Sequence, residues 1–331
     1  MFVLGIDGGG TKTTGIISDQ SGRVIAQDTV GPTNLNSMAT QIAAKELKQL
    51  FQSLESQNVQ AFHRVKVIFA GMSGVDNPEG QRKMRGLLKE MTNNAEIINI
   101  DNDAVNALYS GTLGHPGVVH ISGTGSIAYG LNDKGEHERV GGWGYLIGDP
   151  GSGFAIGRAA LEKIFASYDG YGEKTELTRL LLEKENVNSP IELISSIYEL
   201  GQARRRIAPL SQLVTQAADM GDKVAQTILS DAAGDMATAI KYLIKKLFNR
   251  QEEGLGLREK IPVVLTGGVY RRADLFIPTI KESLSELAIK TELVVPDVPP
   301  VAGALMAAWK SIGKEPDQDF ILGLKKSGLT V

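Results

Sequence analysis

One pattern of apolar and polar positions occurs twice along the chain. Near the start, an apolar run at 2–6 leads into the glycine-rich turn 8–10, and residues 13–18 then alternate. Midway, an apolar run at 118–121 leads into the turn Gly123-Thr124-Gly125, and alternation begins again. Because successive side chains of a strand point to opposite faces, a strand, a tight turn and a second strand would produce this pattern. The repeat therefore predicts two similar domains, each opening with a β-hairpin turned by glycines.

Helices and strands then follow in a similar order in the two halves. In the first half we expect strands at 24–30, 65–70 and 97–100 and helices at 38–54, 81–91 and 104–110. In the second half we expect strands at 126–131, 136–140, 261–265 and 291–295, helices at 273–287 and 300–310, and a long helical stretch at 154–250. This mixture predicts an α/β protein with a helical insertion in its second half. For the tail from 315 onward we predict no element.

Composition narrows the class of protein. A chain of 331 residues, 42% hydrophobic and 22% charged, is typical of a globular protein with two domains. A net charge of −3 does not favour nucleic acid or an anionic membrane as a partner, and the basic run at 204–206 is more typical of a solvated helix face than of a phosphate clamp. Without cysteine the chain cannot form disulfides, thiolate zinc sites or cysteine-held iron–sulfur clusters. No signal peptide and no apolar run of ~18 residues is evident, so we expect a cytoplasmic protein.

The two glycine turns favour a site for phosphate groups. Gly5 and Gly10 have the spacing of a P-loop, but Thr11-Lys12 inverts its last two residues, and alternation follows where a helix is required. The second turn fits Gly-x-Gly-x-x-Ala, yet no helix begins inside it, which excludes a dinucleotide-binding turn. A single hairpin of this kind could be a plain structural turn. Two at matched places instead favour a pair of backbone N–H nests that hold a polyphosphate.

Carboxylates stand at the ends of two expected strands. Asp7 ends the first strand, where it could cap the turn or hold Mg²⁺ beside the phosphates, since Mg²⁺ binds few carboxylates and keeps several waters. Asp103 comes shortly after the strand at 97–100. It could cap the helix 104–110, or it could accept the proton of an attacking hydroxyl group.

A second group of polar and aromatic residues could recognise a small ligand. Trp143 lies between glycines, where it could pack under its own loop or offer a flat apolar wall to a sugar. Asp149 could then bind the hydroxyl groups of that sugar. Asn34 and Ser73 come after two expected strands and could add hydrogen bonds at the same edge, although each alone would be an ordinary turn residue.

With these motifs the chain resembles the sugar kinases of the actin/hexokinase superfamily, and more closely the N-acetylglucosamine kinase branch of the BadF/BadG/BcrA/BcrD ATPase family. The motifs that carry the resemblance lie at 7–12, 121–126, 141–144, 148–152 and 266–269. The resemblance implies two ribonuclease-H-like domains with a cleft between them. It implies an N-terminal domain at 1–113, with the C-terminal helix 301–331 packing back on it. The C-terminal domain would span 114–300 and contain the helical insertion 154–250.

The resemblance also implies ligands and roles for the site residues. ATP and Mg²⁺ are implied as cofactors, and the implied ATP-binding residues are Gly9, Gly10, Thr11, Lys12, Gly123, Thr124, Gly125, Thr266, Gly267 and Gly268. The implied sugar-binding residues are Asn34, Ser73, Gly142, Trp143 and Asp149. Asp103 matches the catalytic base, and Asp7 would hold the metal. The implied reaction transfers the γ-phosphoryl group of ATP to the 6-OH of N-acetylglucosamine.

Several alternatives stay open. Ile127 stands where animal N-acetylglucosamine kinases have Asn, so glucosamine or N-acetylmuramic acid are further candidate substrates. The related activators of 2-hydroxyacyl-CoA dehydratases hold an iron–sulfur cluster with cysteines, which this chain lacks. A regulatory or binding ATPase without a sugar substrate is the alternative from another class. The expected partner is a small amino sugar, with neither nucleic acid nor a membrane, and a homodimer is the candidate oligomer.

Overall fold

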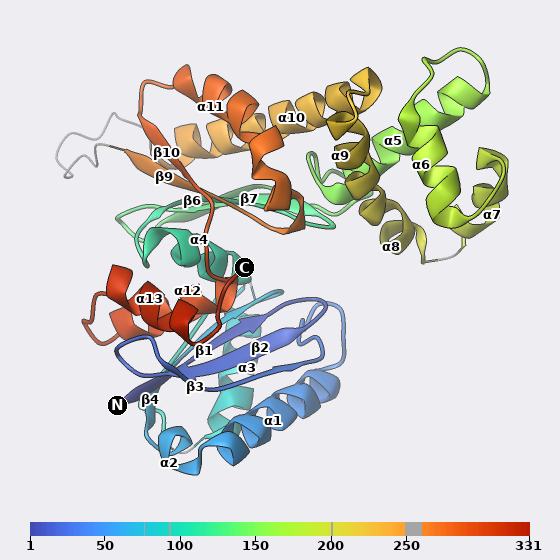
Figure 1. The fold of residues 1–331 in the computed structure, drawn as a ribbon. Helices are drawn as coiled ribbons and strands as arrows, with labels where there is room; N and C mark the ends of the chain where they lie inside the picture. The colour runs from blue at the N-terminus through green and yellow to red at the C-terminus, as the bar shows by residue number, and fades with distance from the viewer. Residues whose placement is uncertain (76, 93, 200, 249–259) are drawn as a thin grey trace. The chain divides into compact units, whose positions relative to one another are not determined.

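The chain forms two compact units, which are drawn in Figure 1. The computed structural model describes residues 1–75, 77–92, 94–199, 201–248 and 260–331. The first unit contains Met1–Gly117 together with Pro296–Val331, and the second contains Val118–Val295.

A five-stranded mixed sheet forms the centre of the first unit. Its strands are β1 (Phe2–Gly8), β2 (Thr13–Ser18), β3 (Val24–Val30), β4 (Val65–Met72) and β5 (Ile97–Asp101), in the order β3-β2-β1-β4-β5. The strands β1, β2 and β3 pair antiparallel, as expected for two hairpins, whereas β1, β4 and β5 pair parallel. The carboxyl ends of these three parallel strands therefore lie at one edge of the sheet.

Helices cover both faces of this sheet. They are α1 (Thr40–Gln57), α2 (Val59–Phe62), α3 (Pro78–Met91), α4 (Asp103–Thr112), α12 (Pro300–Lys310) and α13 (Gln318–Lys326). On one face, Leu4 and Ile6 of β1 join a buried cluster with α1 and α3. On the other face, a Cβ atom on Gly5 would lie 2.8 Å from the backbone nitrogen of Leu305, so the missing side chain lets α12 approach β1.

The second unit repeats the strand order of the first. Its strands are β6 (Gly117–Ser122), β7 (Ser126–Leu131), β8 (His137–Gly141), β9 (Ile261–Thr266) and β10 (Thr291–Val294), in the order β10-β9-β6-β7-β8. The central strand β6 pairs parallel with β9, and β9 pairs parallel with β10. The repeat in the sequence is thus a repeat of topology, and the expected α/β fold is confirmed.

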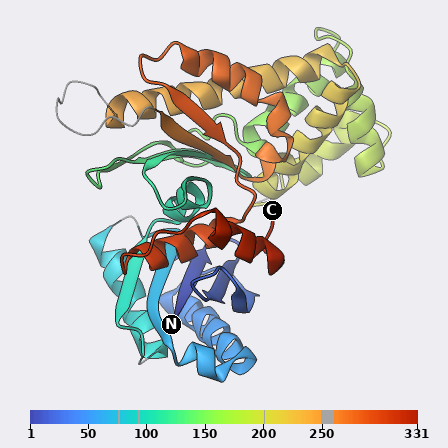
Figure 2. The same cartoon turned by 60° about the vertical axis from the view of Figure 1, so that its left-hand side comes forward.

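Helices of the second unit lie mainly between β8 and β9 in the chain. They are α5 (Gly153–Tyr168), α6 (Glu176–Glu185), α7 (Ile194–Ile197), α8 (Ala203–Ile207), α9 (Ser211–Asp219) and α10 (Lys223–Leu247), with the 3-10 turns η1 (Pro190–Leu193) and η2 (Ala208–Leu210). After β9 come the 3-10 segment η3 (Gly268–Leu275) and the helix α11 (Ile277–Ser285). Figures 1 and 2 show α10 and α11 side by side over the sheet, where their apolar residues share one core with β6 and β9.

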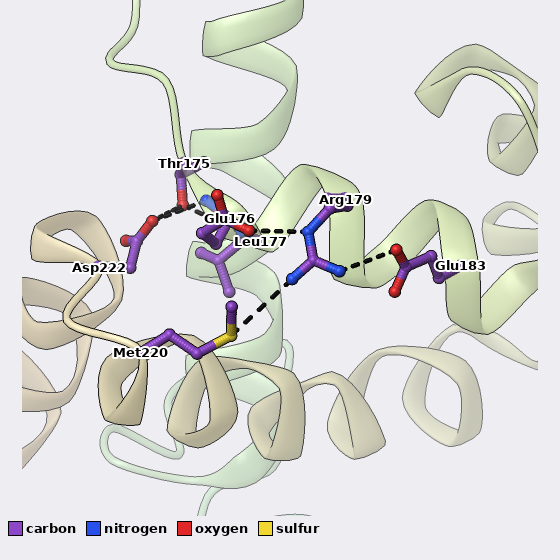
Figure 3. A network of polar contacts seen from close by, with 7 residues as sticks. All are labelled: Thr175, Glu176, Leu177, Arg179, Glu183, Met220 and Asp222. Atoms are coloured by element: carbon purple, nitrogen blue, oxygen red, sulfur yellow. Dashed lines mark hydrogen bonds and ion pairs between the residues drawn. The ribbon is translucent and has the colours of Figure 1, made fainter.

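One carboxylate joins two helices of this insertion (Figure 3). Asp222 caps α10, because its Oδ1 accepts a hydrogen bond from Ala225 N at 2.8 Å. Its Oδ2 accepts hydrogen bonds from Thr175 Oγ1 at 2.9 Å and from Glu176 N at 2.7 Å, at the start of α6. Burial disfavours the charge of Asp222, but these hydrogen bonds outweigh burial, so its pKa lies below the ordinary value.

Two predictions of secondary structure were wrong in part. The tail contains α13, whose first turn is capped by Asp317, since Oδ1 accepts from Phe320 N at 2.9 Å. The single helix expected at 273–287 is divided, because η3 ends at Leu275 and a new helix begins at Ile277 with Pro278 in its first turn. The last two residues of the expected helical stretch, 249 and 250, lie outside the described residues.

Candidate active site

The proposed metal and base residues lie at the same edge of the first sheet. In the registers of β1, β4 and β5, Asp7 lies beside Gly71, and Gly71 lies beside Asp101. Asp103 follows two residues later as the first residue of α4. The carboxyl edge of a parallel sheet is where α/β proteins bind ligands, so the two carboxylates Asp7 and Asp103 are placed where a ligand would bind.

Asp7 is a carboxylate in an environment that disfavours its charge. Burial raises its pKa to about 6, and neither the Asn106 side chain nor the charge of Lys12 lowers it back to the ordinary value. Asn106 Nδ2 donates a hydrogen bond to Asp7 Oδ1 at 2.8 Å. A buried carboxylate with a raised pKa is typical of functional sites, where a bound cation can stabilise the charged form.

Asn106 is a site residue that the sequence analysis missed. It is fully buried, and its Nδ2 also lies 3.2 Å from the carbonyl oxygens of Ile6 and Gly71. A Cβ atom on Gly71 would overlap the Asn106 amide, so glycine at this position lets Asn106 approach β4 closely. Since Asn106 is three residues after Asp103 on α4, its side chain ties the helix of Asp103 to the carboxylate of Asp7. The available signal was a polar side chain between the apolar residues Val105 and Ala107 of a largely buried helix.

The first glycine turn is closed by hydrogen bonds that leave its tip exposed. Gly9 N donates to Lys12 O at 2.9 Å, and Thr33 N donates to Gly9 O at 3.4 Å. In a trans peptide the C=O and the following N–H point in opposite directions, so Gly10 N–H points away from Thr33. Thr11 at the tip is exposed. This geometry is compatible with a phosphate contact.

Asn34 and Ser73 lie together at the end of β1. Asn34 Nδ2 donates to Ser73 Oγ at 3.0 Å, and Ser73 N donates to Gly8 O at 2.7 Å. Both therefore belong to the same edge as Asp7.

Asp103 is not the cap of α4, as one alternative expected. The cap is Asn102, whose Oδ1 accepts a hydrogen bond from Ala104 N at 2.7 Å.

In the second unit, the start of α5 holds the glycine turn between β6 and β7. Gly153 N donates to Gly123 O at 2.8 Å, and Phe154 N donates to Thr124 O at 3.3 Å. With these two carbonyl groups directed at α5, the N–H groups of Thr124 and Gly125 point away from it. Two neighbouring N–H groups with a common direction form a nest for an anion.

The segment Thr266-Gly267-Gly268 runs beside this turn. In the register of β6 and β9, Thr266 lies beside Ile121. Gly267 has φ = 107°, and a Cβ atom there would overlap the Ser122 carbonyl group, so glycine is required. The proposed phosphate turn and the proposed adenosine segment are therefore neighbours within one unit.

A buried pair of side chains fixes η3 to β6 beneath these segments. Tyr270 Oη lies 2.7 Å from His120 Nδ1, and both residues are at most 3% exposed. Burial lowers the pKa of His120 to about 4, so the imidazole is neutral at pH 7. Burial also raises the pKa of Tyr270.

Asp149 lies against the glycine turn of the second unit. It is 7% exposed, and its Oδ1 accepts a hydrogen bond from Gly144 N at 3.0 Å. A Cβ atom on Gly125 would lie 2.6 Å from Asp149 Oδ2. The structure therefore brings one of the proposed sugar-binding residues next to the proposed phosphate turn.

Trp143 is open to solvent. It is 60% exposed, and the Arg139 guanidinium lies 4.1 Å from the centre of its ring. The alternative in which Trp143 packs under its own loop does not hold. Its neighbour Gly142 lies against Ile127, since a Cβ atom on Gly142 would be 2.8 Å from Ile127 Cδ1.

Each unit has groups that suit part of a nucleotide with Mg²⁺. In the first unit Asp7 offers a carboxylate beside a glycine turn, and in the second unit the backbone N–H groups of Thr124 and Gly125 suit phosphate oxygens. Across the described ranges, no three His, Cys, Asp or Glu residues form a cluster that could hold a metal. One carboxylate, phosphate oxygens and waters make a normal Mg²⁺ shell, so the lack of a larger cluster among those residues is compatible with Mg²⁺.

Among the described residues, no helix combines the length and the apolar character that a membrane span requires.

The repeated sheet and its helices are the α/β fold of actin-like ATPases and sugar kinases. A glucokinase of the ROK family from Streptomyces griseus, solved with glucose and AMPPNP, superposes with a TM-score of 0.58 at 16% identity. The alignment covers 93% of this chain and 98% of the glucokinase. At this identity the similarity is one of fold.

Residues 4–308 match the model of the BadF/BadG/BcrA/BcrD ATPase family, and the chain belongs to this family. It is 35% identical over 321 residues to N-acetyl-D-glucosamine kinase of Dictyostelium discoideum, which covers 93% of this chain and 98% of the relative. It is 32% identical over 284 residues to N-acetylmuramic acid/N-acetylglucosamine kinase of Clostridium acetobutylicum, with 86% and 90% covered. The family predicted from the motifs is thus confirmed.

Proposed function

We propose that this protein is an ATP-dependent amino-sugar kinase that phosphorylates the 6-OH of N-acetylglucosamine. The observation that carries the proposal is the arrangement at the edge of the first sheet, where Asn106 joins Asp7 to the helix that begins with Asp103. Phosphoryl transfer requires a metal ion beside the phosphates and a base beside the attacking hydroxyl group, and the buried Asn106 side chain holds the candidates for these two roles, Asp7 and Asp103, in one arrangement. The two relatives named N-acetylglucosamine kinases support the choice of sugar.

The nucleotide is bound chiefly through backbone groups. Gly9, Gly10, Thr11 and Lys12 of the first turn and Gly123, Thr124 and Gly125 of the second hold the phosphates, and Thr266, Gly267 and Gly268 hold the adenosine. Fixed N–H dipoles stabilise the charge of the transferred group without reorganising during the reaction. Mg²⁺ held by Asp7 supplies additional positive charge at the phosphates.

Asp103 acts as the base. Its carboxylate accepts the proton of the 6-OH as the bond from O6 to the γ-phosphorus forms. At the same time the bond between that phosphorus and the bridging oxygen breaks, and ADP leaves with the electron pair. The products are ADP, a sugar phosphate and a protonated Asp103, which returns its proton to solvent.

The sugar is recognised by Asn34, Ser73, Gly142, Trp143 and Asp149. The exposed indole of Trp143 offers an apolar face, and the buried carboxylate of Asp149 can accept hydrogen bonds from hydroxyl groups. N-acetylmuramic acid is the second candidate substrate, because the Clostridium relative is named for both sugars. A cytoplasmic location, where ATP and Mg²⁺ are supplied, belongs to the same proposal.

The base assignment is tested with Asp103→Asn. We expect turnover to fall by about 10²- to 10⁴-fold, because an amide cannot accept the proton, while ATP and N-acetylglucosamine bind nearly as in the wild type. Steady-state kinetics and calorimetric titration measure the two effects separately. The cap of α4 is Asn102, so the substitution leaves the helix start intact. Wild-type turnover in Asp103→Asn would remove the assignment.

A further inference from the structure

Arg204 lies beside the glycine turn of the second unit. A Cβ atom on Gly125 would be 3.1 Å from Arg204 Nη2 and 2.6 Å from Asp149 Oδ2. The sequence predicts a solvated helix face for the basic run that contains Arg204. The structure instead directs one guanidinium of that run at the turn.

One helix fixes both the turn and the segment that carries Arg204. The start of α5 binds the turn through Gly153 N and Phe154 N. One turn further along α5, Gly157 lies against the carbonyl oxygen of Ile207, the last residue of α8, and this contact leaves no room for a side chain. Ile207 and Ala208 are buried against this helix. The short segment of Arg204 is therefore packed in place although its guanidinium is exposed.

The guanidinium of Arg204 lies near one aromatic ring, and its charge is available to a ligand. Arg204 Cζ lies 6.0 Å from the centre of the Tyr145 ring, which in turn packs on Phe154 at 5.0 Å between ring centres. Within the described parts of the chain, no carboxylate lies within 4.0 Å of Arg204, whereas Arg206 pairs with Glu199. An arginine held on an aromatic ring beside an N–H nest has the donors that an oxyanion requires.

We propose that Arg204 binds phosphate oxygens of the nucleotide held by the turn 123–125 and stabilises the charge of the transferred phosphoryl group. The inference rests on the proposed function and adds a catalytic residue to it. A guanidinium forms two parallel hydrogen bonds to a phosphate, and it stays protonated throughout, so the bonds made and broken in the transfer are unchanged. A carboxylate on an acidic sugar has the same oxyanion chemistry. The phosphate is favoured because the N–H groups of Thr124 and Gly125 lie at the same place.

The test compares Arg204→Ala and Arg204→Lys with the matched control Arg205→Ala. For Arg204→Ala we expect an unchanged unfolding temperature and a kcat lower by about 10²- to 10³-fold with N-acetylglucosamine. The kcat of Arg204→Lys should lie between those of the wild type and Arg204→Ala, because lysine keeps the positive charge but cannot donate two parallel hydrogen bonds. In Arg204→Ala the Kd of a non-hydrolysable ATP analogue should rise on the order of 10-fold. The Kd of ADP should rise less. Guanidinium chloride below denaturing concentration should restore part of the activity of Arg204→Ala alone.

Three results would overturn the inference. The first is equal turnover and equal analogue binding in Arg204→Ala and Arg205→Ala. The second is a loss confined to N-acetylmuramic acid, since Arg204 would then bind the sugar carboxylate. The third is a loss of folding in Arg204→Ala together with full activity in Arg204→Gln. If the wild type phosphorylates no sugar, the proposed function fails, and the analogue and ADP titrations alone decide the role of Arg204.

Discussion

Asp7 is held in its site at a cost to the stability of the folded chain. Its carboxylate is removed from water at the end of β1, and one hydrogen bond from Asn106 replaces only part of the lost hydration. The sequence at this point is therefore not optimised for folding. A charge that a bound cation would neutralise explains why an aspartate is kept at this position.

Replacing Asp7 by Asn should raise stability and abolish activity. The pKa of Asp7 is about 6 in the folded protein against 3.8 for the ordinary group. The folded state therefore binds the proton of Asp7 more tightly than the unfolded chain does. This proton stabilises the folded state fully below pH 3.8, and the stabilisation is lost as the pH rises through 6. Asn carries no charge to bury, so Asp7→Asn should exceed the wild type by about 1–3 kcal/mol in unfolding free energy above pH 7.

Chemical unfolding of both proteins without nucleotide or Mg²⁺, from pH 4 to pH 8, measures this difference. The two curves should meet at the acidic end and separate as the pH rises. A loss of stability in Asp7→Asn that is the same at every pH would show that Asp7 is held by favourable contacts instead. Kinase activity measured on the same samples should be lost.

At the residue scale, sequence reasoning finds groups that stand at strand ends and misses groups that act through packing. Asp7 and Asp103 could be predicted because a carboxyl edge of a sheet collects ligand-binding residues. Asn106 was missed since its partners, Ile6 and Gly71, are brought to it only by the pairing of β1 with β4. For the basic run that contains Arg204, the sequence favours a solvated helix face over a phosphate clamp, because the neighbour Gly125 is reached only through the packing of α8 on α5.

At the scale of elements, α5 organises the glycine turn of the second unit. Its first turn holds the glycine turn, and Gly157 lets α8 approach. Helix α10 also contains a glycine, Gly234, but no atom lies within 4 Å of a Cβ placed there. The two glycines therefore differ in what a side chain would meet.

Alanine at these two positions should have opposite effects on stability. In Gly157→Ala the new methyl group meets the backbone of Ile207, which cannot move aside like a side chain, and we expect a loss of about 1–3 kcal/mol. In Gly234→Ala the methyl group meets nothing and the helix gains about 0.5–1 kcal/mol. Urea unfolding of both variants and the wild type measures the difference. Equal effects of the two substitutions would contradict the tight packing of α8 on α5.

The elements themselves show where pattern reasoning works. Strands β2, β3 and β7 and helix α12 have the bounds that alternation and spacing predict. Helix α13 could have been predicted, since Asp317 is a cap and Phe320, Ile321 and Leu324 form an apolar face. The break between η3 and α11, at Phe276, also had a signal, because Pro278 lies inside the expected helix and proline favours the first turn of a helix.

At the scale of the whole molecule, the chain is a duplicated fold with one large addition. The strand orders β3-β2-β1-β4-β5 and β8-β7-β6-β9-β10 correspond strand by strand. Each copy presents its glycine turn after its central strand. The helices α5 to α10 are additional to the second copy, and they contribute the contacts that hold its turn and Arg204.

The central claim is that a sugar hydroxyl accepts the γ-phosphoryl group of ATP at this site. The most direct measurement is sugar-dependent release of ADP with N-acetylglucosamine, with the phosphorylated position of the product mapped by NMR. We predict one ADP for each sugar consumed and phosphate on O6. Hydrolysis of ATP at a rate that no amino sugar changes would contradict the account and would favour a nucleotide-dependent binding protein.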